Sequence, residues 1–221
     1  MLGELMSDRT DYYADFELTT LVRRTESVKG NEWCEPLWFR SGCESGLAVF
    51  VSALDAEIYR LAAAKQGHIG WERLPLSNFD LLAHIKEMGG SLSCRIVFGF
   101  GASLSREHSA GTSGAPRPLL VPALFEVGPA VDRPISFQFE AWIFEFMRQQ
   151  WSLIGPEDYP AQVEAMNTSC DSELSQAAAQ AISSIVLHEA ADTDHDWCLF
   201  SPSTASWHFG PTELRQAQHI H

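Results

Sequence analysis

The sequence predicts an α+β or α/β fold in which a mixed sheet packs against several helices. Three observations favour this class. An apolar run, GLAVFVS at 46–52, leads directly into a capped helical segment. A second apolar run, CRIVFGF at 94–100, follows two helical segments, and the pattern near the C-terminus is typical of a β-hairpin. We expect one domain over residues 1–221, with possible sub-structures at 30–101 and 119–221.

The segment from Gly46 to Gly101 carries the clearest pattern. Both alternating faces of 47–51 are apolar, which is typical of a central strand that is covered on both sides. Ser52 and Asp55 form a variant of the capping box, because the hydroxyl can accept an orphan amide while the carboxylate lies in the first helical turn. The helix is expected to end near Gly67. Its predicted inward stripe is Leu54, Ile58, Leu61 and Ala62.

The same pattern recurs before the second strand. Ser77 to Asp80 is predicted to cap another helix over 81–88, and Gly89-Gly90 provides a left-handed stop. The coarse order is therefore strand, helix, helix, strand. The first thirty residues are less regular. Their apolar positions, which permit a helix, are Phe16, Leu18, Leu21 and Val22.

Residues 101–118 are rich in Gly, Ser and Pro and predict a mobile loop. The run LLVPALFEV at 119–127 predicts a strand at a sheet edge or a bulge, because Pro122 cannot donate to a ladder. Ile135 and Phe137 then suggest extended backbone. A helical stripe of large side chains follows and is predicted to face the core. Its members are Phe139, Trp142, Ile143, Phe146, Met147 and Trp151.

The final third predicts helices followed by a hairpin. Pro160 to Met166 suits a short helix that begins with proline, and Asp171 or Ser172 caps a longer one. The segments 197–201 and 206–209 flank a Pro-Ser-Thr-Ala turn, and 211–221 suits a short terminal helix. The inward face of the longer helix is predicted to be Leu174, Ala178, Ala181, Ile182, Ile185 and Val186.

The composition limits the kinds of partner. With 29 acidic and 15 basic residues the net charge is −14, which disfavours nucleic-acid binding and favours a basic protein partner. The alternative reading is that the acidity serves solubility alone. No apolar stretch long enough to span a membrane and no secretion signal is recognised. The five cysteines are odd in number and scattered, so a reducing, cytoplasmic location is expected.

One cluster offers candidate metal ligands. His188-Glu189 begins the zinc-protease pattern HExxH, but Asp192 replaces the second histidine. The alternating acids of 192–196 resemble the start of a calcium loop, but Trp197 stands where the turn needs glycine. An acidic connection between helix and strand is the simpler interpretation. The candidate ligands for a divalent ion are His188, Asp192, Asp194, His195 and Asp196.

Nucleophile and cofactor motifs are incomplete. Gly42 to Gly46 resembles the G-x-S-x-G elbow, but its central residue is Glu44 and it precedes a strand. Cys43 could pair with a distant histidine, although the sequence gives no proximity. The run Gly99-Phe-Gly101 lacks the third glycine of a dinucleotide loop, so no cofactor is predicted.

Several segments carry a family resemblance. GLAVFVSALDAEIYR, WERLPLSNFDLLAHI and SCRIVFGF together resemble bacterial SseB-like domains and several immunity-type or accessory proteins. The segment WCLFSPSTASWHFG is similar to small α+β proteins found near secretion and toxin loci. The resemblance implies a scaffold and transfers no functional residue.

The sequence favours a non-enzymatic cytosolic protein that binds another protein through an acidic face, as an immunity or secretion-accessory factor does. The alternative is a hydrolase or metal-dependent enzyme whose site is assembled from distant His, Asp, Glu or Cys residues. The sequence leaves the oligomeric state open.

Overall fold

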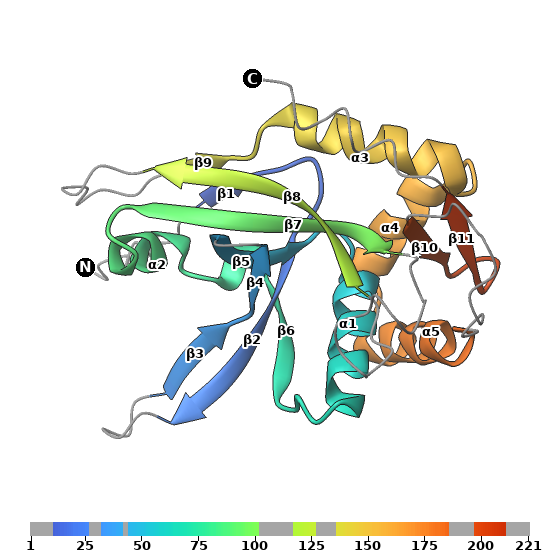
Figure 1. Cartoon of the computed structure of the whole chain (residues 1–221), viewed down its shortest axis with the longest axis horizontal. Helices are drawn as coiled ribbons and strands as arrows, with labels where there is room; N and C mark the ends of the chain where they lie inside the picture. The colour runs from blue at the N-terminus through green and yellow to red at the C-terminus, as the bar shows by residue number, and fades with distance from the viewer. Residues whose placement is uncertain are drawn as a thin grey trace, which may run out of the picture.

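The computed structural model describes residues 11–26, 32–41, 44–101, 117–126, 136–185 and 197–210. It confirms the predicted α+β class, with parallel and antiparallel strands in one sheet that packs against helices (Figure 1). The strands are β1 (Asp11–Tyr13), β2 (Thr19–Glu26), β3 (Glu32–Pro36), β4 (Trp38–Ser41), β5 (Glu44–Phe50), β6 (Trp71–Pro75), β7 (Ser91–Gly101), β8 (Arg117–Glu126), β9 (Ser136–Gln138), β10 (Trp197–Ser201) and β11 (Ser206–Gly210). The helices are α1 (Ala53–Lys65), the 3-10 turn η1 (Leu76–Asn78), α2 (Leu81–Glu87), α3 (Ala141–Ile154), α4 (Tyr159–Thr168) and α5 (Asp171–Ser183).

The main sheet is built around β5 and β7. Its described strands follow the order β11-β10-β7-β5-β2-β3, with β4 on β5, β6 on β2 and β8 on β7. β5 and β7 pair in parallel, so the chain between them is a crossover that carries α1, β6 and α2. β1 and β9 form a separate parallel pair. A parallel pair needs cover on both faces, and the helices supply it.

β5 is the central strand that the sequence predicts. Leu47, Val49 and Val51 face one apolar cluster, whereas Ala48 and Phe50 face another, and all five side chains are buried. Phe139, Ile143, Met147 and Trp151 of the predicted aromatic stripe join the first cluster, which also contains Phe144. Burial on both faces of one strand accounts for its unbroken apolar run.

Three apolar clusters hold the layers together. The largest lies between one sheet face and α2, α3 and α4. A second joins α1, α5 and the β10–β11 hairpin, where Leu174, Ala178 and Ala181 meet Phe200. The third packs α1 against β2, β4 and β5 through Ala56. In Figure 1, α3 lies along one edge of the molecule, while α1, α4, α5 and the hairpin gather at one end of the sheet.

The boundaries near α1 and α2 agree closely with the sequence pattern. Ser52 caps α1 by accepting a hydrogen bond from the Asp55 amide at 3.3 Å, as predicted. Gly67 follows the helix with a φ of 88°, and Gly89 and Gly90 end α2 with φ of 79° and 101°. These left-handed conformations favour glycine because it lacks a Cβ.

Up to Trp142 the predictions are wrong at four places. The N-terminal apolar residues form no helix: Leu21 and Val22 lie in β2, whose pairing with β3, β5 and β6 decides its conformation. β6 was not expected between the two helices. Asp80, not Ser77, caps α2 by accepting from the Ala83 amide. Trp142 was predicted to face the core but is 47% exposed.

The second half otherwise follows its prediction. β8 pairs only with β7 among the described strands, as an edge strand does, and it contains Pro122. α4 carries proline in its first turn, and β10 and β11 form the predicted hairpin. α5 starts at Asp171, but its N-cap is Cys170 and no side chain caps it, so the predicted cap at Asp171 or Ser172 is wrong. Residues 102–116 of the loop predicted at 101–118 lie outside the described residues, whereas Gly101 ends β7 and 117–118 begin β8. The start of the predicted extended segment at 135, Val186 and the predicted helix at 211–221 also lie outside them.

Gly46 gives a test of the β5–β7 packing. The Arg95 side chain lies across this glycine, and a Cβ at residue 46 would lie 2.8 Å from the Ser93 carbonyl oxygen and 3.0 Å from Arg95 Cγ. Backbone cannot move cheaply, so Gly46→Ala should lower the free energy of unfolding by about 1–3 kcal/mol in a urea titration. Ser45→Ala, at the adjacent exposed position, is the control. Equal stability of both variants would contradict this packing.

Candidate functional site

The metal ligands that the sequence suggested lie outside the described residues, within 186–196. Cys43, of the possible Cys-His pair, also lies outside them. In the part of the chain that is described, no group of three or more His, Cys, Asp or Glu is arranged to hold a metal ion. None of the described helices combines the length and the apolar character needed to cross a membrane. The remaining candidates are buried polar groups and charged groups on the surface.

The junction between β5 and α1 is closed by a side chain from α4. Asn167 Oδ1 accepts a hydrogen bond from the Ala53 amide at 2.7 Å, and Asn167 Nδ2 donates to the Val51 carbonyl at 3.0 Å and to the Glu17 carbonyl at 3.2 Å. Ser52 accepts from the amide of Asp55, two residues further along the first turn. Side chains thus occupy helix donors that could otherwise receive an anion. The geometry agrees with the sequence reading of Ser52 as a cap.

Asp55 is a buried carboxyl group beneath this junction, 2% exposed. Burial raises its pKa from the usual 3.8 to about 7. The pKa of Tyr159 on α4 is raised well above its usual value, mainly by burial and further by Asp55. A buried carboxyl group with a pKa near neutrality is a feature of many catalytic acids, but here the protein encloses the group.

The buried thiols are protonated at neutral pH. Burial raises the pKa of Cys94 to about 12, against the effect of the nearby Arg95 charge. Burial also raises the pKa of Cys198 to about 12, and Asp55 adds to that shift. A thiol with this pKa supplies almost no thiolate, which is the nucleophilic form. Neither cysteine is an activated nucleophile.

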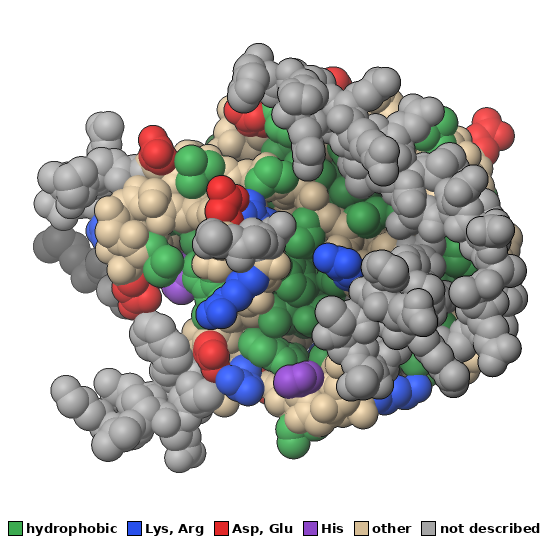
Figure 2. All heavy atoms as spheres, viewed as in Figure 1, with side chains coloured by type: hydrophobic (Ala, Val, Ile, Leu, Met, Phe, Trp, Pro, Cys, Tyr) green, Lys and Arg blue, Asp and Glu red, His purple; other side chains and the backbone are tan. Residues whose placement is uncertain are grey.

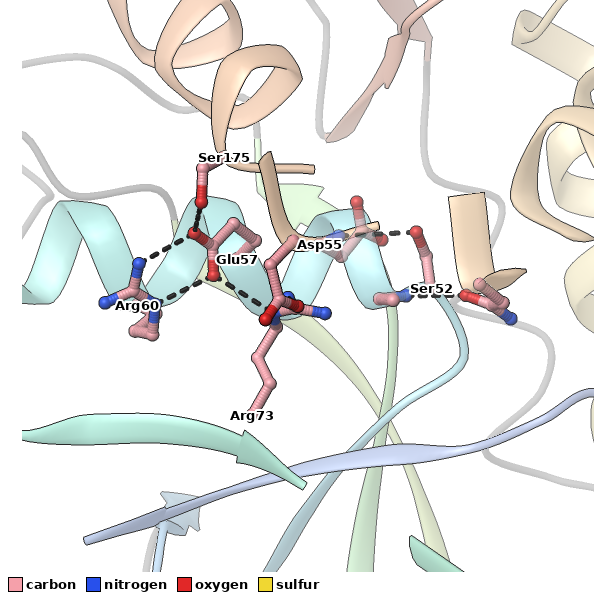
Figure 3. A network of polar contacts seen from close by, with 9 residues as sticks. Ser52, Asp55, Glu57, Arg60, Arg73 and Ser175 are labelled. Atoms are coloured by element: carbon pink, nitrogen blue, oxygen red, sulfur yellow. Dashed lines mark hydrogen bonds and ion pairs between the residues drawn. The ribbon is translucent and has the colours of Figure 1, made fainter. Parts of the chain in front are cut away.

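A second buried carboxylate, Glu57, ties three elements together (Figure 3). Arg60 donates to both of its oxygens at 2.7 Å, Arg73 donates from β6 at 3.1 Å, and Ser175 donates from α5 at 2.6 Å. Arg73 also reaches the exposed Asp171. Burial disfavours ionisation of Glu57, but the hydrogen bonds and charges of Arg60, Ser175 and Arg73 outweigh it, so its pKa is lowered.

Sequence reasoning missed most of these groups. Glu57 and Arg60 have the i, i+3 spacing of a helical ion pair, which was a usable signal. Asn167 and Ser175 gave none, because each lies more than a hundred residues from its partner on α1.

The arrangement around Glu57 leaves no hydrogen-bonding capacity for a substrate, and its chemistry is structural.

The surface charge is unevenly distributed along the chain. Residues 140–221 contain 12 acidic and two basic residues, a net charge of −10, whereas residues 1–139 contain 17 acidic and 13 basic residues, a net charge of −4. Within 140–173, which spans α3 to the start of α5, all seven acidic side chains are exposed. They are Glu140, Glu145, Glu157, Asp158, Glu164, Asp171 and Glu173. We call these seven residues the acidic surface.

The cations of the sheet are largely matched by nearby carboxylates. Arg23 pairs with Glu35 at 2.6 Å, and Arg95 pairs with Glu44 at 2.7 Å. Of the acidic surface, only Asp171 forms an ion pair with another described residue. Figure 2 shows a different character on the face toward the viewer, where hydrophobic side chains gather at the centre with Lys and Arg beside them. The unmatched negative charge is therefore concentrated on the helical part.

Searches of protein-family models, of curated proteins and of solved structures find no match for this chain.

Asp55 makes the stability depend on pH. The unfolded carboxyl group loses its proton near pH 4, whereas the folded one keeps it to about pH 7, so the folded state binds more protons between these values. Its contribution is present in full below pH 4 and is lost as the pH rises through 7. Asp55→Asn should therefore gain stability relative to the native protein as the pH rises, by on the order of 3 kcal/mol between pH 5 and pH 8. Urea titrations at both pH values test this.

The exposed Glu164→Gln is the matched control and should not change the pH dependence. If Asp55→Asn follows the native pH dependence throughout, Asp55 ionises normally in the fold.

Glu57→Gln tests the buried hydrogen-bond network around Glu57. The variant removes the buried counter-charge of Arg60 and Arg73, and Arg73 keeps only the exposed Asp171. Because Glu57 is 1% exposed, the free energy of unfolding should fall by about 2–4 kcal/mol. Asp171→Asn, whose side chain is 94% exposed, should cost less than about 1 kcal/mol. Equal effects of the two changes in denaturant titrations would show that Glu57 is not the centre of the network.

Proposed function

We propose that this chain is a non-enzymatic protein-binding protein whose acidic surface contacts a basic partner, in the manner of an immunity or secretion-accessory factor. The single observation that carries the proposal is the acidic surface itself. Seven exposed carboxylates lie on residues 140–173, where Arg148 is the one basic residue. Arg148 is already paired with Asp15 at 2.7 Å. The resemblance to SseB-like domains and immunity-type proteins points to the same class.

The buried polar groups support the non-enzymatic part of the proposal. Asp55 is enclosed and uncharged at mildly acidic pH, and Cys198 is enclosed and uncharged at neutral pH. Glu57 is saturated by four hydrogen bonds from three residues. A general acid or nucleophile must reach its substrate within hydrogen-bond distance. These groups instead face other parts of the protein, which is typical of structural roles.

The distribution of charge supports the part of the proposal that concerns a basic partner. Like charges spread over one part of a surface attract an oppositely charged protein and speed its association, and they suppress contact with acidic proteins. Their effect declines with salt because the screening length is about 8 Å at physiological ionic strength. Binding through the acidic surface should therefore depend strongly on salt.

A charge-reversal pair tests the proposal. Glu145→Lys with Glu164→Lys changes two residues of the acidic surface, while Glu87→Lys with Glu126→Lys makes the same change in net charge on exposed residues of α2 and β8. Each purified protein is used to capture proteins from a lysate of the source cell at low and high salt. We expect basic proteins bound by the native chain to be lost, by roughly tenfold or more, with the first pair only.

Binding that the two pairs weaken equally would reflect net charge alone. Captured proteins that are neutral or acidic, or that stay bound at high salt, would contradict an electrostatic interface.

A further inference from the structure

We infer that the outer face of α3 is the recognition element of the acidic surface and that it binds a basic amphipathic helix of the partner. This inference rests on the proposed function and adds the binding element and the partner's chemistry. The face is defined by Trp142, Glu145, Gln149 and Leu153, and we call these four residues the α3 stripe. All four are exposed.

The two tryptophans of α3 have opposite roles. Trp151 is 1% exposed and donates its indole N–H to the Phe98 carbonyl at 2.9 Å, which fixes α3 to β7. Trp142 lies nine residues earlier, half a turn away around the helix at about 100° per residue, and is 47% exposed. Folding does not require an aromatic residue on that side. Tryptophan, with tyrosine and arginine, is enriched among the residues that dominate the binding energy of protein interfaces.

Carboxylates frame the exposed indole. The Trp142 N–H donates to Glu140, which fixes the ring, and Glu145 lies one turn further along the same face. A ring face beside carboxylates suits a lysine or arginine side chain, since the cation can contact the ring and pair with a carboxylate. The Trp142 ring and the carboxylates beside it therefore favour lysine or arginine, whose charged group is carried on an apolar chain.

The spacing of the stripe favours a helix as occupant. Its members follow one another at intervals of three, four and four residues, the spacing with which helices pack side by side. Trp142 and Leu153 are eleven residues apart, about 16 Å along the axis, or three turns of a partner helix. Leu153 is 57% exposed and offers an apolar contact at the far end. The carboxylates of Glu140 and Glu145 at the stripe require the partner helix to be basic beside its apolar face.

Two synthetic peptides of about 18 residues test the inference. One arranges Lys and Leu as an amphipathic helix, and the other scrambles the same composition. Binding of each fluorescent peptide is measured by anisotropy to the native chain, to Trp142→Ala, to Trp142→Phe and to Leu124→Ala. Leu124 is 64% exposed on β8 and gives the matched apolar control. Circular dichroism verifies that each variant is folded.

We expect the amphipathic peptide to bind at least roughly tenfold more tightly than the scrambled one, and Trp142→Ala to remove about tenfold of that affinity. Trp142→Phe should retain most of it and Leu124→Ala all of it. Equal affinity for the two peptides, or equal losses in Trp142→Ala and Leu124→Ala, would overturn the inference.

The charge-reversal pair distinguishes failure of the proposed function from failure of the inference about the α3 stripe. If Glu145→Lys with Glu164→Lys weakens both peptides equally while Trp142→Ala changes nothing, the acidic surface binds cations without the α3 stripe, and the inference alone fails. If the charge reversal leaves both peptides unaffected, the proposed function fails together with the inference.

Discussion

Asn167 satisfies the backbone at the point where the chain leaves β5 and enters α1. Its amide accepts from Ala53 and donates to Val51 and Glu17, so one side chain completes the polar groups of a strand end and a helix start. Buried backbone groups without partners are costly, and a strand that runs directly into a helix creates several. Because Asn167 belongs to α4, the same bonds fix the position of the helical layer against the sheet. α3 is fixed separately, by the Trp151 hydrogen bond to the Phe98 carbonyl.

Two carboxylates on α1 show how neighbouring positions acquire opposite properties. Asp55 and Glu57 are both almost fully buried and are separated by one residue. Asp55 faces Tyr159 and Cys198, which carry no charge to offset its own, and burial raises its pKa. Glu57 faces two arginines and a serine, which hold its charge and lower its pKa. The helix supplies both groups, and the elements packed against each face decide their ionisation.

The same packing separates the charges of the surface. Arginines on the strands lie close to carboxylates of neighbouring strands, as with Arg23 and Glu35, so much of the sheet is balanced. The helices from α3 onward bring acidic residues with almost no cations. Trp142 lies amid that charge with its ring exposed, whereas Trp151 on the same helix is enclosed. The described surface of this helical part is therefore both acidic and aromatic.

The sequence alone determined the α+β class, the central strand at 46–52, the Ser52 cap and the C-terminal hairpin, because each depends on residues close together in the chain. It also determined the excess of negative charge. Tertiary structure alone decided that Thr19–Glu26 is a strand. The spacing of its apolar residues suits a helix or a strand, and pairing with β3 and β6 selects the strand. It likewise turned Trp142 outward against the aromatic pattern of its helix. Asn167 and Ser175 became partners of α1 only on folding, because hydrogen bonds across more than a hundred residues leave no local pattern.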